Sequence, residues 1–99
     1  MRSVTPPSEA AIQRQVMTAL EKEGWTCVKL IQTNLNGMPD ILCLRHGMTM
    51  FIEVKSETGK PSPMQLHRIE KLKNCGFGAY VVSSVKQLYL LGLIKEPCN

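Results

Sequence analysis

The chain has 99 residues, of which 43% are apolar and 20% are charged, a composition typical of a small globular domain with one hydrophobic core. No apolar run approaches the roughly eighteen residues that cross a bilayer, so we expect no membrane-spanning segment. The 12 Lys and Arg residues exceed the 8 Asp and Glu residues, which gives a formal net charge of +4. This balance favours a polyanionic partner such as nucleic acid.

The ends of the chain and its cysteines indicate where the protein works. No apolar leader follows Met1, so we expect a cytoplasmic protein. We expect residues 1–7 to form an N-terminal tail, residues 8–95 a single domain and residues 96–99 a C-terminal tail. The cysteines lack the C-x-x-C spacing of a zinc site, and we expect reduced, buried thiols. They are Cys27, Cys43, Cys75 and Cys98.

The first predicted element is a helix from Ser8 to Glu23. Its apolar residues recur at the spacing of one helix face: Ile12, Val16, Ala19 and Leu20. Ser8 is a suitable N-cap, and Gly24 follows the end of the pattern. Glu9 lies in the first turn, where its charge complements the helix dipole, so this acid has a structural explanation beside any functional one.

A strand, a loop and a hairpin follow. Residues 26–32 have the β-branched and apolar content of a strand, and the Asn-Gly and Pro within residues 33–39 predict a loop. Two more strands, residues 41–45 and 48–55, flank His46-Gly47. This pair suits a tight turn because Gly, and to a lesser degree His, tolerates positive φ.

The second half of the chain predicts a helix, a strand and a terminal helix. Residues 62–74 form the first of these, with a capping box completed by Gln65. This helix is expected to bury Leu66, Ile69 and Leu72. Residues 79–83 read as a strand, and residues 84–94 as a helix that opens with a second Ser-x-x-Gln box. The predicted order is α-β-β-β-α-β-α, an α/β fold.

The hairpin geometry brings two acids together. A two-residue turn at His46-Gly47 pairs residues whose numbers sum to 93, so Asp40 lies directly across from Glu53. Opposed side chains of an antiparallel pair lie about 5 Å apart, and like charges placed in this way are destabilising. A divalent cation removes the repulsion, and oxygen ligands suit Mg²⁺ or Mn²⁺. Lys55 projects from the same face, where its ammonium can stabilise charge on a phosphate oxygen.

Alternation along residues 48–55 assigns the two faces of that strand. The expected core face carries Met50, Ile52 and Val54. The expected site face carries Thr49, Phe51, Glu53 and Lys55. The competing interpretation is a surface hairpin with an exposed mixture of Glu and Lys, and the apolar density of residues 41–44 argues against it.

Three short motifs occur in an order that resembles a known nuclease family. They are G-x-P-D at residues 37–40, E-V-K at residues 53–55 and P-x-x-x-Q-L at residues 61–66. Together they resemble the VRR-Nuc branch of the PD-(D/E)XK nuclease superfamily, over residues 9–91. The resemblance implies a restriction-endonuclease-like core in which helices flank a central mixed sheet.

The same resemblance implies a metal-dependent site that hydrolyses phosphodiester bonds. Asp40, Glu53 and the main-chain carbonyl of Val54 inherit the roles of Mg²⁺ or Mn²⁺ ligands, and Lys55 inherits the role of the catalytic lysine. A water activated by the metal attacks phosphorus in line. No histidine base is required.

Two further roles follow from the resemblance, each with an alternative. The family carries an acid on the first helix that completes the metal shell. Glu9 matches this acid by residue type, whereas Gln13, one turn further on, lies nearer to the position that the distance to Gly24 suggests for it. Gln65 matches a glutamine that touches the site or DNA, although it also belongs to a capping box. The family loop often carries an arginine before the G-x-P-D motif, whereas this chain has Asn34-Leu35-Asn36.

Phosphate contacts are expected from polar residues on and beside the helix at 62–74. The set is Asn36, Lys60, Gln65, His67, Arg68, Lys71 and Lys73. An ordinary solvated helix face is the alternative interpretation. No recognition-helix motif or aromatic platform is evident, so selection by DNA shape is expected.

The resulting hypothesis is a homodimeric, structure-selective DNA endonuclease that resolves branched DNA such as Holliday junctions. The resemblance implies a phage or mobile element, and hence a bacterial or phage-infected host cell. Two alternatives stay open: a related nuclease acting on flaps, nicks or linear duplex, and a DNA-binding subunit without catalysis.

Overall fold

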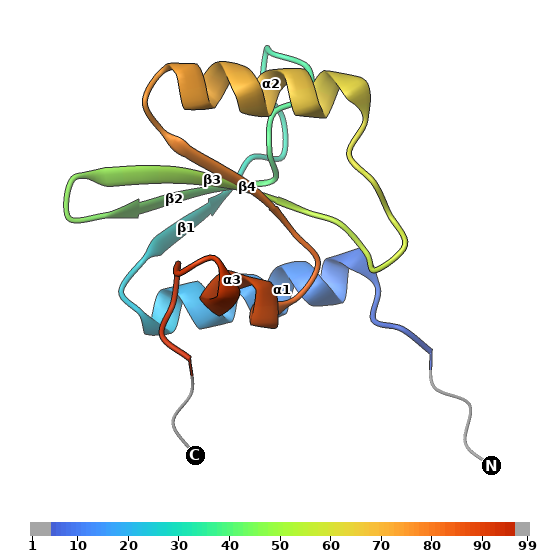
Figure 1. Ribbon diagram of the computed structural model, residues 1–99, viewed down its shortest axis with the longest axis vertical. Helices are drawn as coiled ribbons and strands as arrows, with labels where there is room; N and C mark the ends of the chain where they lie inside the picture. Colours follow the sequence, from blue (N-terminus) through green and yellow to red (C-terminus); the bar gives the residue numbers. More distant parts are fainter. Residues whose placement is uncertain (1–4, 97–99) are drawn as a thin grey trace.

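The computed structural model describes residues 5–96, which form an α/β fold in the predicted order of elements. These elements are α1 (Glu9–Lys22), β1 (Thr26–Lys29), β2 (Ile41–Arg45), β3 (Met48–Val54), α2 (Pro63–Asn74), β4 (Gly78–Val82) and α3 (Val85–Leu90). Helices α1 and α3 lie on one face of the sheet and α2 lies on the other (Figure 1).

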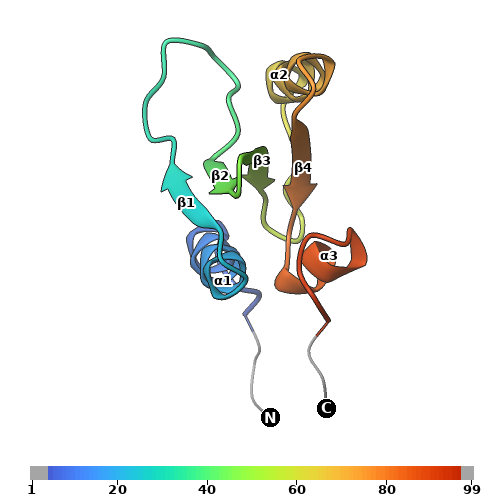
Figure 2. The same ribbon diagram turned by 90° about the vertical axis from the view of Figure 1, so that its left-hand side faces the viewer.

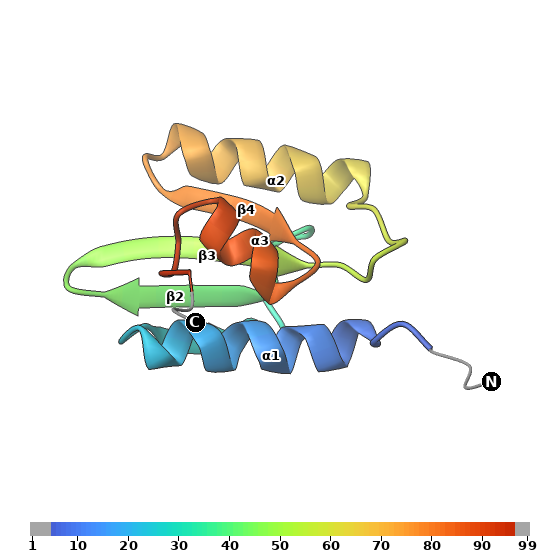
Figure 3. The same cartoon turned by 60° about the horizontal axis from the view of Figure 1, so that its bottom comes forward.

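The strands form one mixed sheet in the order β1-β2-β3-β4. The β1–β2 and β2–β3 pairs are antiparallel, and the β3–β4 pair is parallel. Parallel neighbours need a crossover connection, and α2 supplies it between β3 and β4. The side view in Figure 2 shows the resulting three layers, and Figure 3 shows α1 and α2 on either side of the strands.

The turn between β2 and β3 has the predicted geometry. Arg45 pairs with Met48, which leaves His46 and Gly47 as a two-residue loop. Their φ angles are 49° and 76°. Positive φ at both central positions defines the turn whose twist matches that of the flanking strands. The predicted register of the hairpin is confirmed along its whole length.

Serine side chains begin the three helices α1, α2 and α3. The Oγ atoms of Ser8, Ser62 and Ser84 each accept a hydrogen bond from the backbone N–H three residues further on. The second predicted capping box is only half formed, because Gln87 Oε1 accepts a hydrogen bond from the N–H of Ser83 instead of Ser84. Each cap satisfies a donor that the first helical turn leaves unpaired.

Two apolar clusters hold the layers together. The larger one joins the sheet to α1 and α3, and consists of Ile12, Val16, Leu20, Trp25, Ile41, Cys43, Met50, Ile52, Val54, Val82 and Leu88. The smaller one lies under α2 and consists of Phe51, Ile69 and Ala79. The predicted alternation along β3 is therefore correct, and Phe51 belongs to a second core beside the site.

Helix α2 buries less apolar surface than the sequence predicts. Ile69 is buried and Leu72 is half-buried, but Leu66 is 53% exposed. Because α2 packs against β4, at the edge of the sheet, the flank that carries Leu66 faces solvent. The prediction that Leu66 is buried is wrong.

Several other details differ from the prediction. Strand β1 ends at Lys29, three residues early, and α3 ends at Leu90, four residues early. Cys43 is buried and Cys27 is half-buried, but Cys75 is exposed because it is the C-cap of α2. Cys98 lies outside the described residues, and the boundaries of the two tails stay predictions. Within residues 5–96, no helix has the length and apolar character needed to cross a bilayer.

We predict that Ile52→Ala lowers the free energy of unfolding by about 2–5 kcal/mol, because Ile52 is fully buried on β3, between β2 and β4. Leu66→Ala is the matched control and changes it by less than about 0.5 kcal/mol, because that side chain is half in water already. Urea unfolding measures both values. Equal losses in the two variants would contradict the assignment of the core.

Candidate active site

The candidate site lies where β2 begins and β3 ends. The last antiparallel pair in the register is Ile41 with Ile52, so continuing the register outward by one position brings Asp40 toward Glu53, whose pKa responds to the charge of Asp40. Asp40 directly precedes β2, and both its side chain and its main chain accept hydrogen bonds. Its Oδ2 accepts a hydrogen bond from the backbone N–H of Val54 at 2.8 Å, and its main-chain oxygen accepts one from the N–H of Leu30 at 2.8 Å.

Glu53 is the buried centre of the site, with 1% of its surface exposed. Its Oε2 accepts a hydrogen bond from Gln65 Nε2 at 2.9 Å and lies 3.2 Å from Lys55 Nζ. Its second oxygen, Oε1, is buried without a hydrogen-bond partner among residues 5–96. A buried polar atom of this kind costs free energy unless a ligand or water meets it.

The electrostatics of the pair follow from burial and from mutual repulsion. Burial, and then the charge of Asp40, raises the pKa of Glu53 from 4.5 to about 7, against the opposing effect of Lys55. Burial also raises the pKa of Asp40, and Glu9 adds to the rise, while the hydrogen bond from Val54 opposes it. Both carboxyl groups therefore ionise less readily than usual, unless a cation joins them.

Glu9 lies within electrostatic reach of both acids, since its charge raises the pKa of each. Its side chain is exposed at the start of α1, and Gln13, one turn on, is half-buried. In the part of the chain that the structure describes, no three His, Cys, Asp or Glu side chains converge as a ready metal site. Glu9 therefore does not form a three-carboxylate cluster with Asp40 and Glu53 in this conformation, and its role as a metal ligand stays a prediction.

Gln65 completes the predicted capping box and also contacts Glu53. Its Oε1 accepts a hydrogen bond from the backbone N–H of Ser62 at 2.8 Å, which completes the capping box of α2. Its Nε2 donates to Glu53 at the same time. The two ends of one amide therefore join the start of α2 to the buried carboxylate of β3.

The expected DNA contacts divide into two groups. Lys60, His67 and Lys71 are exposed, as are Asn36 and Lys73, and these residues are free to meet a phosphate backbone. Arg68 differs, because it is half-buried and its Nε donates a hydrogen bond to the main-chain oxygen of Asn36 at 3.1 Å. Sequence reasoning missed this contact, which joins segments 32 residues apart and leaves no local signal.

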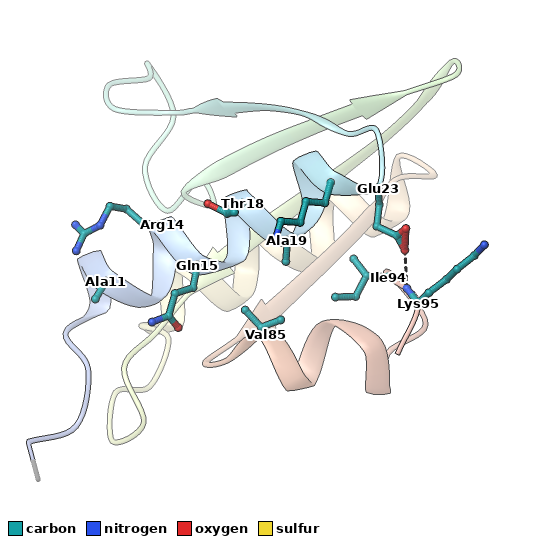
Figure 4. Close-up of a pocket in the computed structure, with 10 residues that line it drawn as sticks. Ala11, Arg14, Gln15, Thr18, Ala19, Glu23, Val85, Ile94 and Lys95 are labelled. Carbon is teal, nitrogen blue, oxygen red and sulfur yellow. Dashed lines mark hydrogen bonds between the residues drawn. The ribbon is translucent and has the colours of Figure 1, made fainter. Parts of the chain in front are cut away.

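A cavity of about 610 Å³ lies away from these residues, between α1 and the segment that includes α3 and Ile94 (Figure 4). Arg14, Gln15 and Thr18 line it from α1, and Val85 lines it from the other side. Glu23 accepts a hydrogen bond from the N–H of Lys95 at its end. None of the predicted site residues lines this cavity.

Comparisons with known proteins agree with the fold and with a nuclease family. A family model described as the VRR-NUC domain matches residues 5–86. A protein named "Putative nuclease p44", from Acyrthosiphon pisum secondary endosymbiont phage 1, is 29% identical over 77 residues, which are 77% of this chain and 83% of that protein.

A solved structure described as "VRR_NUC domain" has the same fold. It superimposes with a TM-score of 0.75 and 33% sequence identity, and the alignment covers 86% of this chain and 95% of that chain. The matched range contains the residues of all three motifs and every element from α1 to β4. The chain therefore belongs to the VRR-NUC domain family of the PD-(D/E)XK nuclease superfamily.

Proposed function

We propose that this nuclease is a Mg²⁺- or Mn²⁺-dependent DNA endonuclease that hydrolyses phosphodiester bonds in branched DNA, such as Holliday junctions, as a homodimer. The observation that carries the proposal is the buried carboxylate of Glu53, which lies opposite Asp40 and contacts both Lys55 and Gln65. A structural role alone gives no reason to bury an acid beside another acid, because burial and like charge both oppose ionisation.

The residues present fit a divalent cation. Glu53 Oε1 is buried without a partner in the described chain, and the opposing carboxyl of Asp40 repels it until a cation joins the two. Asp40, Glu53 and the main-chain carbonyl of Val54 would hold the ion, with Glu9 completing the set from α1. All are oxygen ligands, as Mg²⁺ and Mn²⁺ prefer. When bound, such an ion polarises a phosphate and makes water more acidic.

The remaining chemistry belongs to the side chains of this chain. The side chain of Lys55 is only 17% exposed, so its charge is weakly screened where a phosphate would gain negative charge during attack by water. Gln65 donates to Glu53 Oε2, so Glu53 Oε1 is the oxygen that stays available to a ligand. The N–H of Val54 holds Asp40 Oδ2 in the same manner. Both acids are thus oriented before substrate arrives.

Support for a DNA substrate comes from charge. The chain carries a formal net charge of +4, and the acids Asp40 and Glu53 are committed to the site. Lys60, His67 and Lys71 are exposed on α2 and the loop before it, and α2 also carries Gln65, which contacts Glu53. A two-fold dimer would carry two such sites, which suits paired cuts in a symmetric junction.

We predict that wild-type protein with Mg²⁺ or Mn²⁺ cuts a labelled four-way junction, and that a chelator abolishes cutting. Lys55→Ala is expected to bind the junction but cut it about 10²–10³-fold more slowly, because it removes a preorganised charge from the reaction centre. Lys22→Ala, at an exposed lysine in the last turn of α1, is the matched control and keeps the rate.

Flap and linear duplex substrates in the same assay test the preference for branched DNA. If the protein cuts the flap or the linear duplex and leaves the junction intact, the proposed preference for branched DNA is wrong, and the protein is a related nuclease with a different DNA substrate. Binding to all three substrates with no cutting in either metal would reject catalysis.

We predict a pH-dependent stability that metal reverses. Because the folded state raises the pKa of Glu53 from 4.5 to about 7, it holds that proton more tightly than the unfolded chain does. The free energy of unfolding, measured with chelator, should therefore fall by up to about 3 kcal/mol as pH rises from about 4.5 to above 7. Asp40 contributes a change of the same sign.

Saturating Mg²⁺ should restore stability above pH 7, because the ion binds the ionised carboxylates. Thermal unfolding against pH, with and without Mg²⁺, measures the effect. Glu53→Gln should lose the Mg²⁺ response and most of the pH response, keeping only the part due to Asp40, whereas Glu57→Gln, at an exposed glutamate, should keep both responses in full. A Mg²⁺ response that survives in Glu53→Gln would place the ion elsewhere.

We predict that sedimentation finds a species of twice the 11.1 kDa chain mass at micromolar concentration. A dimer is expected because paired cuts need two sites in one particle. A species of single-chain mass that still makes both cuts in one binding event would contradict the dimer and leave the catalytic site unaffected.

A further inference from the structure

We propose that Arg68 is a positioning residue, which fastens the loop of residues 30–39 to α2 and thereby holds Asp40 opposite Glu53. This proposal rests on the proposed function for its catalytic consequence. It departs from the expectation that Arg68 contacts phosphate. The structure carries it through two contacts between this loop and α2.

The first contact is the hydrogen bond from Arg68 Nε to the main-chain oxygen of Asn36 at 3.1 Å. Residues 31–36 are exposed, and within them Thr33 Oγ1 donates a hydrogen bond to the main-chain oxygen of Leu35 at 2.7 Å. That contact is internal to the loop. The guanidinium of Arg68 thus reaches from α2 to the loop backbone, four residues before Asp40.

The second contact lies at Gly37, the residue after Asn36. Gly37 has a φ of 79°, and a Cβ built on it would lie 2.6 Å from the main-chain oxygen of Met64. The loop backbone therefore rests directly on the backbone of α2, one residue before Gln65. Met64 and Arg68 are four residues apart on the helix and lie on the same flank. Both contacts thus meet a single strip of α2.

This strip joins the two halves of the site. From Gly37 the chain passes through the fully buried Pro39 to Asp40, while Gln65, next to Met64, holds Glu53. The loop–helix contact therefore sets the distance between the element that carries Asp40 and the helix that orients Glu53. A misplacement of about 1 Å between reacting groups can cost about 10²-fold in rate.

The geometry of Arg68 favours positioning over a phosphate contact. Its neighbour His67 and Lys71, one turn further from His67, are exposed, whereas Arg68 is half-buried. Its Nε is engaged by a main-chain oxygen, which fixes the plane of the guanidinium. A lysine has no donor that corresponds to Nε and no planar group that such a hydrogen bond could orient. The chemistry used here is the directional donation of arginine and not its charge alone.

The test compares two variants that break the contact from opposite sides. Arg68→Ala removes the donor. Gly37→Ala adds a Cβ against Met64 at positive φ and alters no charge, so it removes no charged phosphate contact. Arg14→Ala, at an exposed arginine of α1, is the control for loss of charge. Junction affinity, its salt dependence and the single-turnover cleavage rate are measured for each.

Positioning predicts that Arg68→Ala and Gly37→Ala both slow cleavage about 10–10²-fold at saturating protein, with junction affinity within about twofold of wild type. Arg14→Ala should keep the wild-type rate. If Arg68→Ala instead weakens binding, lowers the salt slope by about one and keeps the rate at saturation, Arg68 is a phosphate contact and the proposal is wrong.

Hydrogen exchange separates this proposal from the proposed function. The N–H of Val54 is bonded to Asp40 Oδ2, and the N–H of Leu30 is bonded to the main-chain oxygen of Asp40, so both amides report where Asp40 lies. In Arg68→Ala and in Gly37→Ala these two amides should exchange at least about tenfold faster than in the wild type, while the amides of α1 keep their protection. Unchanged exchange at Val54 and Leu30 would overturn the positioning role, whether or not the wild type cuts DNA.

Discussion

The arrangement of the whole domain depends on the burial of one ionisable carboxyl group. Glu53 is 1% exposed, yet it lies across from a second acid, so it needs partners that a small domain supplies only by bringing several elements to one point. Lys55 comes from the end of its own strand and Gln65 from the first turn of α2. The crossover that returns the chain for β4 is therefore also what carries the amide donor to Glu53.

The register of the hairpin is the second constraint, because strand side chains alternate between faces. A slip of one residue in the β2–β3 pairing would move Glu53 to the α1 face and place it among the apolar side chains there. The His46-Gly47 turn prevents this by allowing one pairing. A feature at the far end of the hairpin thus determines which face of the sheet carries the acid.

The sequence predicts well whatever depends on neighbouring residues. The hairpin register, the helix caps at Ser8 and Ser62 and the approach of Asp40 to Glu53 follow from turn chemistry and strand period. The sequence predicts poorly whatever depends on how one element packs against another. Leu66 is exposed because α2 covers the edge of the sheet, and the contact of Arg68 with Asn36 depends on the path of a loop far away in the chain. Periodicity contains neither fact.

The double use of Gln65 limits how this domain can change. A glutamate closes a capping box as well as a glutamine does, so for the helix alone the two are interchangeable. In this chain, a glutamate there would direct an oxygen, in place of a donor, at Glu53 Oε2. Helix capping and site chemistry therefore share one amide group, and of the two residues that close the capping box, glutamine is the one that also supplies a donor to Glu53.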